Sequence, residues 1–191
     1  MDSGGRRKMP WMLKARPRKT VADFMRLPEG TLAELIDGEI YTRSPSPETV
    51  HQRVVGHIYL ALRTFVEPRR LGEVLLSPLD VHLGTGDIVE PDVIFVRAGR
   101  RLVRRWIYGA PDLLVEVISP SRPERDLIVK RRVYMDAGVR EYWIVDPKAR
   151  TVEVLALAGT RWRPAGYFRV GNAIRSRVLP GLRLPVRRVF R

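Results

Sequence analysis

Short apolar runs that alternate with longer helical segments constrain the fold of this chain more than any other feature. Four runs rich in valine, leucine and isoleucine have the length and composition of buried strands: residues 92–96, 112–118, 141–146 and 151–157. Two longer segments carry apolar residues at helical spacing: residues 46–68 and 121–138. This order of elements predicts an α/β fold, in which a mixed β-sheet is flanked by helices.

Local signals predict further elements and how they begin. Thr20 and Asp23 form a capping-box pattern that predicts a short helix near the N-terminus. A preferred two-residue turn between alternating apolar residues predicts a β-hairpin over residues 32–43. The two longer helices are expected to have their N-caps at Ser46 and Ser121. The remaining strands are expected over residues 74–83 and 161–170.

The positive charge of the chain is concentrated at its two ends. The formal net charge is +14 over 191 residues. Residues 1–19 carry seven basic side chains and one acid, and residues 161–191 carry nine arginines and no acid, whereas the segment between them is close to neutral. Basic ends suit a polyanion, because neutralised phosphates release counterions. A GC-rich genome or a hot habitat also produces many arginines, so charge alone leaves this partner open.

Several classes of protein are excluded by composition. The chain has no cysteine, which excludes disulfides, thiolate zinc sites and cysteine nucleophiles. Its three histidines lack the paired spacing of a zinc site. The sequence has no apolar run long enough for a signal peptide or a membrane-spanning helix. We therefore expect a cytoplasmic protein with a flexible basic tail over residues 1–18 and one domain over residues 19–191.

Two acidic residues lie inside apolar strands, where an ionised carboxylate is costly unless a partner stabilises it. Asp92 opens the strand over residues 92–96, and Glu116 interrupts the strand over residues 112–118. If the two strands are neighbours, the carboxylates converge, and hard oxygen ligands favour Mg²⁺ or Mn²⁺. The alternatives are a buried salt bridge to an arginine, or a carboxylate at the end of a strand that faces solvent.

Lys130 lies on the apolar stripe of the helix that follows Glu116. The first turns of that helix fold back close to the end of the strand, so the lysine is placed to hold or activate a water beside a metal ion. The alternative is an ordinary surface ion pair with Asp126, four residues earlier in the helix.

These residues, in this order, resemble the Uma-type restriction endonuclease family of the PD-(D/E)XK nuclease superfamily. The matching motifs are Pro91-Asp92, EVISPS from Glu116, Asp126-x-x-x-Lys130, Tyr134, GVREYWIVDP over 138–147, LIDGEI over 35–40 and SPSPETVH over 44–51. The resemblance covers most of residues 20–150. It implies a restriction-endonuclease-like core, to which the short helix and the β-hairpin are N-terminal additions.

The resemblance also implies roles for individual residues. Asp92 and Glu116 would bind Mg²⁺ or Mn²⁺ together with the backbone carbonyl of Val117, and Lys130 would act on the attacking water. The superfamily places its lysine two residues after the glutamate, where this chain has Ile118. In this chain the lysine would have moved to the following helix.

Further candidates surround this set. Glu39 and His51 are secondary catalytic candidates; the alternatives are an exposed hairpin partner of Arg43 for Glu39 and a first-turn helix residue for His51. Asp112, in the second Pro-Asp pair, is expected only to start a strand. The loop between the two acidic strands carries four arginines that we expect to hold phosphates near the cut: Arg100, Arg101, Arg104 and Arg105.

The sequence therefore predicts a metal-dependent endonuclease that hydrolyses phosphodiester bonds of nucleic acid, with DNA favoured, and that forms a homo-oligomer. Two other classes of protein stay open. One is a non-catalytic nucleic-acid-binding relative that keeps the fold and the basic ends. The other is a self-associating structural or interaction protein whose strand over residues 140–146 pairs with a second copy. Metal-dependent cleavage separates the nuclease from both.

Overall fold

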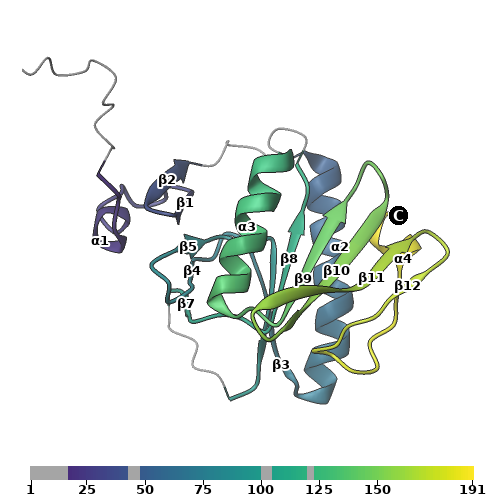
Figure 1. Cartoon of the computed structure of the whole chain (residues 1–191). Helices are drawn as coiled ribbons and strands as arrows, with labels where there is room; N and C mark the ends of the chain where they lie inside the picture. The colour runs from purple at the N-terminus through teal and green to yellow at the C-terminus, as the bar shows by residue number, and fades with distance from the viewer. Residues whose placement is uncertain (1–16, 43–47, 100–104, 120–122) are drawn as a thin grey trace, which may run out of the picture.

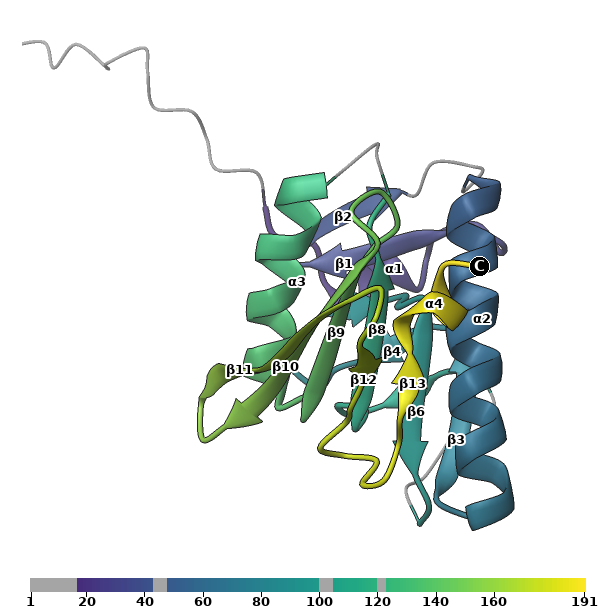
Figure 2. The same ribbon diagram turned by 90° about the vertical axis from the view of Figure 1, so that its right-hand side faces the viewer.

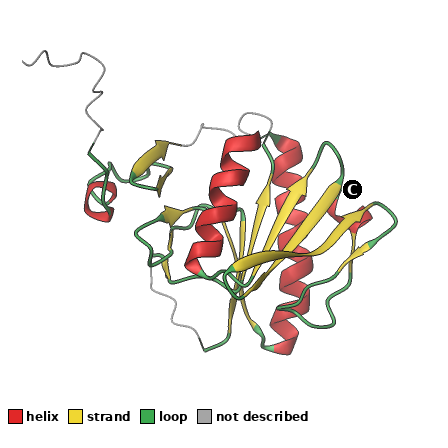
Figure 3. Ribbon diagram, viewed as in Figure 1, coloured by secondary structure: helices red, strands yellow, loops and turns green. Residues whose placement is uncertain are grey.

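A mixed β-sheet between two long helices forms the body of the protein (Figures 1 and 3). The computed structural model describes residues 17–42, 48–99, 105–119 and 123–191. Within these residues the main sheet has six strands in the order β11-β10-β9-β8-β6-β3. Their bounds are β3 Gly72–Leu76, β6 Val93–Arg97, β8 Leu113–Val117, β9 Glu141–Asp146, β10 Thr151–Ala158 and β11 Arg161–Arg169. β8 and β9 are parallel and the other neighbours are antiparallel, which confirms the expected mixed sheet.

The two long helices cover opposite faces of this sheet (Figure 2). Helix α2, Thr49–Val66, buries Val54, Ile58 and Leu62 against Val93 and Val115, and it is followed by the 3-10 turn η1, Glu67–Arg69. Helix α3, Pro123–Ala137, buries Val133 and Tyr134 on the other face, where Leu114 lies. The expected N-caps Ser46 and Ser121 lie outside the described residues.

A second, smaller sheet carries the N-terminal elements. Its strand order is β2-β1-β5-β4-β7, with β1 Ala33–Ile36, β2 Glu39–Thr42, β4 Val81–His82, β5 Ile88–Val89 and β7 Ile107–Tyr108. β1 and β2 form the expected hairpin, and its turn residues Asp37 and Gly38 have φ values of 54° and 75°, as this tight turn requires. Helix α1, Val21–Phe24, begins at the predicted capping box of Thr20 with Asp23.

The single strand expected over residues 74–83 is wrong. β3 ends at Leu76 in the main sheet, and β4 begins at Val81 in the second sheet. Pro78 lies between them, and a proline has no N–H group to continue a strand ladder. The chain thus passes from one sheet to the other within a stretch of ten residues.

The alternative in which the strand over residues 140–146 pairs with a second copy is also wrong. β9 is an interior strand, because it pairs with β8 on one edge and with β10 on the other. A strand whose two edges are both hydrogen-bonded has no row of free backbone groups to offer a partner. The edges of the main sheet are instead β3 and β11.

The C-terminal segment packs over the α2 side of the sheet, which the sequence did not predict (Figure 2). It contains β12, Ala173–Ile174, β13, Leu184–Pro185, and the one-turn helix α4, Val186–Val189. Val186 and Val189 are fully buried in the same core cluster as α2. Nδ1 of His57 on α2 lies 3.0 Å from the carbonyl oxygen of Val189.

Glu141, at the start of β9, anchors this C-terminal segment. Its side chain is fully buried, and Oε1 accepts a hydrogen bond of 2.7 Å from Nε1 of Trp143. Oε2 accepts bonds of 2.6 Å and 3.3 Å from the backbone N–H groups of Arg177 and Val178. A buried carboxylate is tolerated here because three donors surround it.

Glu141→Gln is expected to lower the free energy of unfolding by about 1–3 kcal/mol, because an amide nitrogen cannot accept and leaves buried donors without a partner. Urea unfolding measures this change. The matched control is Glu153→Gln on β10, whose partly exposed ion pair with Arg131 is worth about 0–1 kcal/mol. Equal losses in the two variants would show that Glu141 is not an anchor.

The N-terminal boundary of the domain stays a prediction. Residues 1–16 lie outside the described part of the chain. Nε of Arg18 donates a hydrogen bond of 3.1 Å to the carbonyl oxygen of Asp37 in the hairpin turn. In the described ranges, none of the helices is long and apolar enough to cross a membrane.

Candidate active site

Asp92 and Glu116 are brought together by the antiparallel pairing of β6 and β8. Val93 pairs with Val115, so Asp92 at the start of β6 lies beside Glu116 near the end of β8. Side chains two residues apart on a strand share a face, and both acids therefore lie on the α3 face with Leu114. Oδ2 of Asp92 accepts a hydrogen bond of 2.8 Å from the backbone N–H of Val117. Both side chains are buried.

Lys130 reaches this point from α3. Its Nζ atom lies 2.9 Å from Oε1 of Glu116 and 2.9 Å from Oε1 of Glu34, and the lysine is only 6% exposed. The surface ion pair with Asp126 is therefore the wrong interpretation of Lys130. Ile118 follows the last residue of β8 and packs among apolar residues. The position at which the Glu-x-Lys pattern has its lysine is thus apolar here, and α3 brings Lys130 to the carboxylates instead.

Asp92, Glu116 and Lys130 form a buried cluster of charged side chains, and Glu34 is a further member of it. Glu34 was not predicted from the sequence. It lies on β1 between Ala33 and Leu35 and is buried. Besides Lys130, its Oε1 accepts a hydrogen bond of 2.9 Å from the backbone N–H of Glu90. The signal was present in the sequence, because Glu34 is an acid inside an apolar strand, just as Glu116 is.

His51 and Tyr134 hold the two central carboxylates. Nε2 of His51, in the first turn of α2, lies 3.3 Å from Oδ2 of Asp92. The hydroxyl of Tyr134 on α3 donates a hydrogen bond of 2.6 Å to Oε1 of Glu116. Glu39, the other secondary candidate, is exposed on β2 and accepts a hydrogen bond of 2.6 Å from the hydroxyl of Tyr41. The structure thus places His51, but not Glu39, in the cluster.

The cluster carries more negative than positive charge. Three buried carboxylates, those of Glu34, Asp92 and Glu116, are matched by Lys130 and by a histidine that is charged only when protonated. Burial raises the pKa of Glu116 to about 7, and the charges of Asp92 and Glu34 add to this effect while Lys130 opposes it. Glu116 therefore takes up a proton near neutral pH unless a further cation stabilises its charge.

The pKa shifts of Asp92 and Lys130 favour the charged forms of these two side chains. Burial alone would raise the pKa of Asp92, but the hydrogen bond and charge of His51, the N–H of Val117 and the charge of Lys130 lower it below its ordinary value. Burial alone would lower the pKa of Lys130, but the carboxylates of Glu116 and Glu34 raise it. Asp92 and Lys130 are thus both held in their charged forms.

The donor set fits a Mg²⁺ or Mn²⁺ ion bound by two carboxylates. No group of three or more histidine, aspartate and glutamate side chains suited to hold a metal is found in the described ranges. Mg²⁺ does not need such a cage, because it commonly uses one or two carboxylates and keeps several waters. In the described part of the chain both contacts of Glu116 use Oε1, which leaves Oε2 for a ligand. The backbone of Val117 adjoins both acids.

Three of the four loop arginines cannot be placed relative to the two acids. Arg100, Arg101 and Arg104 lie outside the described residues, and Arg105 is exposed. β6 runs away from Asp92, so Arg97 at its end lies about 17 Å from Asp92 at about 3.3 Å per residue. There the buried Asp112 accepts a hydrogen bond of 2.9 Å from the N–H of Arg97, directly before β8 begins. Phosphate binding by the loop arginines stays a prediction.

The mixed sheet, its two covering helices and the carboxylates at the β6–β8 junction define a restriction-endonuclease-like fold. A family model described as "Uma2: Putative restriction endonuclease" matches residues 21–187, and the chain belongs to this family. It is also similar to a crystal structure described as a "putative nuclease belonging to DUF820" from Anabaena variabilis ATCC 29413. The TM-score is 0.76 at 22% identity, over 90% of this chain and 97% of that chain. No curated protein matches.

Proposed function

We propose that the protein is a Mg²⁺- or Mn²⁺-dependent endonuclease that hydrolyses phosphodiester bonds of nucleic acid, with DNA as the favoured substrate. The observation that carries this proposal is the convergence of Asp92 and Glu116 at one buried point whose negative charge Lys130 does not balance. A divalent cation would balance it. Membership of a family described as "Putative restriction endonuclease" supports the same chemistry.

Each residue of the cluster then has a distinct part in the reaction. Asp92 and Glu116, with the carbonyl oxygen of Val117, would hold the ion, which when bound lowers the pKa of a water and neutralises charge on the scissile phosphate. Lys130 orients the attacking water or stabilises the charge that develops during attack. Its second contact, with Glu34, holds the ammonium group at this point.

His51 and Tyr134 act through the carboxylates that they contact. Partners of this kind orient metal ligands, and losing one typically costs about 10–100-fold in metal affinity or activity. His51 fixes Asp92 from α2, and Tyr134 fixes Glu116 from α3. The geometry of the site therefore depends on elements from both faces of the sheet.

A titration with Mg²⁺ or Mn²⁺ is expected to show saturable binding, measured by calorimetry without nucleic acid. At a metal concentration of 100 times Kd, the ion should stabilise the protein by about 2.7 kcal/mol, seen as a rise in Tm. Asp92→Ala should weaken the affinity by more than about tenfold, because it removes a ligand rather than a group that only supports one.

The matched control is Asp112→Asn, which changes the acid of the other Pro-Asp pair, at the far end of β8. It should leave metal affinity unchanged. Wild-type protein that shows neither heat nor a Tm rise with either ion would contradict the proposed enzyme, and the non-catalytic relative would then be the better interpretation.

A further inference from the structure

We propose that the turn between β9 and β10, together with α4 and the C-terminal residue, forms a phosphate-binding surface that holds the nucleic acid on one side of the cut. This surface, here called the basic rim, consists of Lys148, Arg150, Arg187, Arg188 and Arg191. The proposal rests on the proposed nuclease function, and it assigns the contacts with flanking phosphates to residues far from the loop over residues 100–105 in the sequence.

The first observation is topological. β8 and β9 are parallel, and Val117 pairs with Val145, so the C-terminal ends of the two strands lie side by side (Figure 1). The turn after β9 therefore lies beside the strand end that carries Glu116. Lys148 and Arg150 in this turn are exposed. Glu116 pairs with Ile144, and the turn begins three residues later, so at about 4.8 Å between strands and about 3.3 Å per residue the turn lies about 11–14 Å from Glu116.

The second observation is the position of α4 at the same end of the molecule. Nη2 of Arg150 donates a hydrogen bond of 3.1 Å to the carbonyl oxygen of Phe190, which ties the C-terminus to the β9–β10 turn. Val186 and Val189 are buried, whereas Arg187 and Arg188 between them are exposed on the outer side of the turn.

Helix α2 links α4 to the site. The carbonyl oxygen of Val189 lies 3.0 Å from Nδ1 of His57. His57 follows His51 by six residues, which is about 9 Å along the helix axis. Figure 2 shows α4 and the C-terminus beside the half of α2 that also carries His51. The basic rim and the catalytic cluster therefore share one end of the molecule.

The third observation is the charge of this end. The chain has no acidic residue after Glu153. Glu153 pairs with Arg131 at 2.7 Å, and Oδ1 of Asp146 accepts a hydrogen bond of 2.9 Å from the N–H of Ala149. The basic rim thus has excess positive charge, and arginine donors match phosphate oxygens in geometry. Such contacts position a backbone without reading its bases.

The spacing suits nucleic acid better than an isolated phosphate group. The phosphates of one strand repeat about every 3.4 Å along the axis of a duplex, so a distance of about 11–14 Å from the turn to Glu116, measured along that axis, corresponds to three or four nucleotides. The basic rim would then contact phosphates a few nucleotides from the cut, and α4 would contact phosphates further away.

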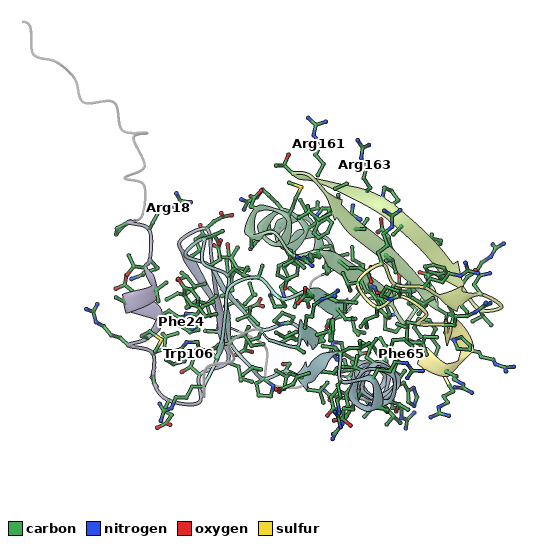
Figure 4. All side chains as sticks on the ribbon, turned by 90° about the horizontal axis from the view of Figure 1, so that it is seen from below. Arg18, Phe24, Phe65, Trp106, Arg161 and Arg163 are labelled. Carbon is green, nitrogen blue, oxygen red and sulfur yellow. The ribbon has the colours of Figure 1, made fainter. Side chains whose placement is uncertain are left out.

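The test compares two pairs of exposed arginines from the same C-terminal run. Arg187→Gln/Arg188→Gln changes the basic rim. Arg161→Gln/Arg163→Gln is the matched control, because it removes the same charge at the other end of β10, about 26 Å from the β9–β10 turn at about 3.3 Å per residue. Figure 4 shows Arg161 and Arg163 extending into solvent, away from the body of the protein.

Binding of a fluorescent DNA duplex is measured by anisotropy in EDTA, over a range of salt concentrations, so that neither metal nor cleavage is needed. The variant of the basic rim should bind at least about tenfold more weakly, and its salt slope should fall by about 1.8, since each phosphate contact contributes about 0.9. The control should keep the wild-type slope. With Mg²⁺, the rim variant should raise KM and leave kcat unchanged.

Equal losses in the two double variants would overturn the proposal, because binding would then follow net charge rather than this surface. An unchanged salt slope in the rim variant would also overturn it, while wild-type cleavage would leave the proposed function standing. A selective loss in the rim variant, with no cleavage by wild-type protein, would support the basic rim and contradict the nuclease. Wild-type protein that binds no DNA would overturn both.

Discussion

Asp92→Ala and Glu116→Ala are each expected to reduce Mg²⁺-dependent cleavage of DNA to below about one hundredth of the wild-type rate. Loss of a group that only supports a metal ligand costs about 10–100-fold, and these variants remove the ligands themselves. Metal affinity, measured by calorimetry, should fall together with the cleavage rate, which is measured on a labelled duplex.

Lys130→Ala is expected to separate these two quantities. A lysine acts on the water and the developing charge and does not bind the ion, so cleavage should fall by about 10²–10⁴-fold while metal affinity stays close to that of wild type. Nucleic-acid binding should survive all three changes, because none of them alters an exposed basic residue.

Asp112→Asn is the control for these variants and should keep wild-type cleavage. Two results would contradict the proposed roles. The first is cleavage by Asp92→Ala at the wild-type rate, which would place the chemistry elsewhere. The second is loss of metal binding in Lys130→Ala to the same degree as in Glu116→Ala, which would show that the cluster fails as a whole rather than residue by residue.

The second large effect concerns stability. Without metal, Lys130→Met should lower the free energy of unfolding by about 3–5 kcal/mol, because removing one partner of a buried ion pair leaves uncompensated charge. Two carboxylates, Glu34 and Glu116, lose their shared cation in this variant. Urea unfolding in EDTA measures the loss. Lys148→Met, at an exposed position, should change stability by less than about 0.5 kcal/mol.

A double variant distinguishes charge from packing as the cause of this loss. Lys130→Met/Glu116→Gln removes one carboxylate as well, so it should recover part of the lost stability if repulsion is responsible. Asp92→Asn bears on the same question: because His51, the N–H of Val117 and Lys130 lower the pKa of Asp92, its charge stabilises the fold, and this change should destabilise the metal-free protein at neutral pH. A double variant less stable than Lys130→Met would show that the packing of the lysine stem accounts for the loss.

The elements that the sequence predicted correctly are those with a strong local signal. The capping box at Thr20, the hairpin turn at Asp37-Gly38 and the strands around Asp92 and Glu116 all appear as expected. The strand over residues 74–83 failed because composition does not show which of two sheets a strand joins. β5, β7 and the C-terminal elements β12, β13 and α4 are too short to produce a periodic pattern.

The candidate site shows the same division. An acid inside an apolar strand is visible in the sequence, and Asp92 and Glu116 were found in that way. Glu34 has the same signal on β1, but its contact with Lys130 depends on how the hairpin lies against α3. Glu39 lies on the other strand of the same hairpin, β2, and is exposed. Membership of the hairpin therefore does not by itself bring an acid to the site.

The sequence by itself determined the order of the elements, the identity of the two central carboxylates and the helix that supplies the lysine, because these follow from periodicity and from the cost of burying charge. Only the tertiary structure decided that β8 and β9 end side by side, that His51 and Glu34 reach the cluster, and that β9 is an interior strand. Such contacts join residues that are distant in the chain. Strand order and packing create them, and no local pattern encodes either.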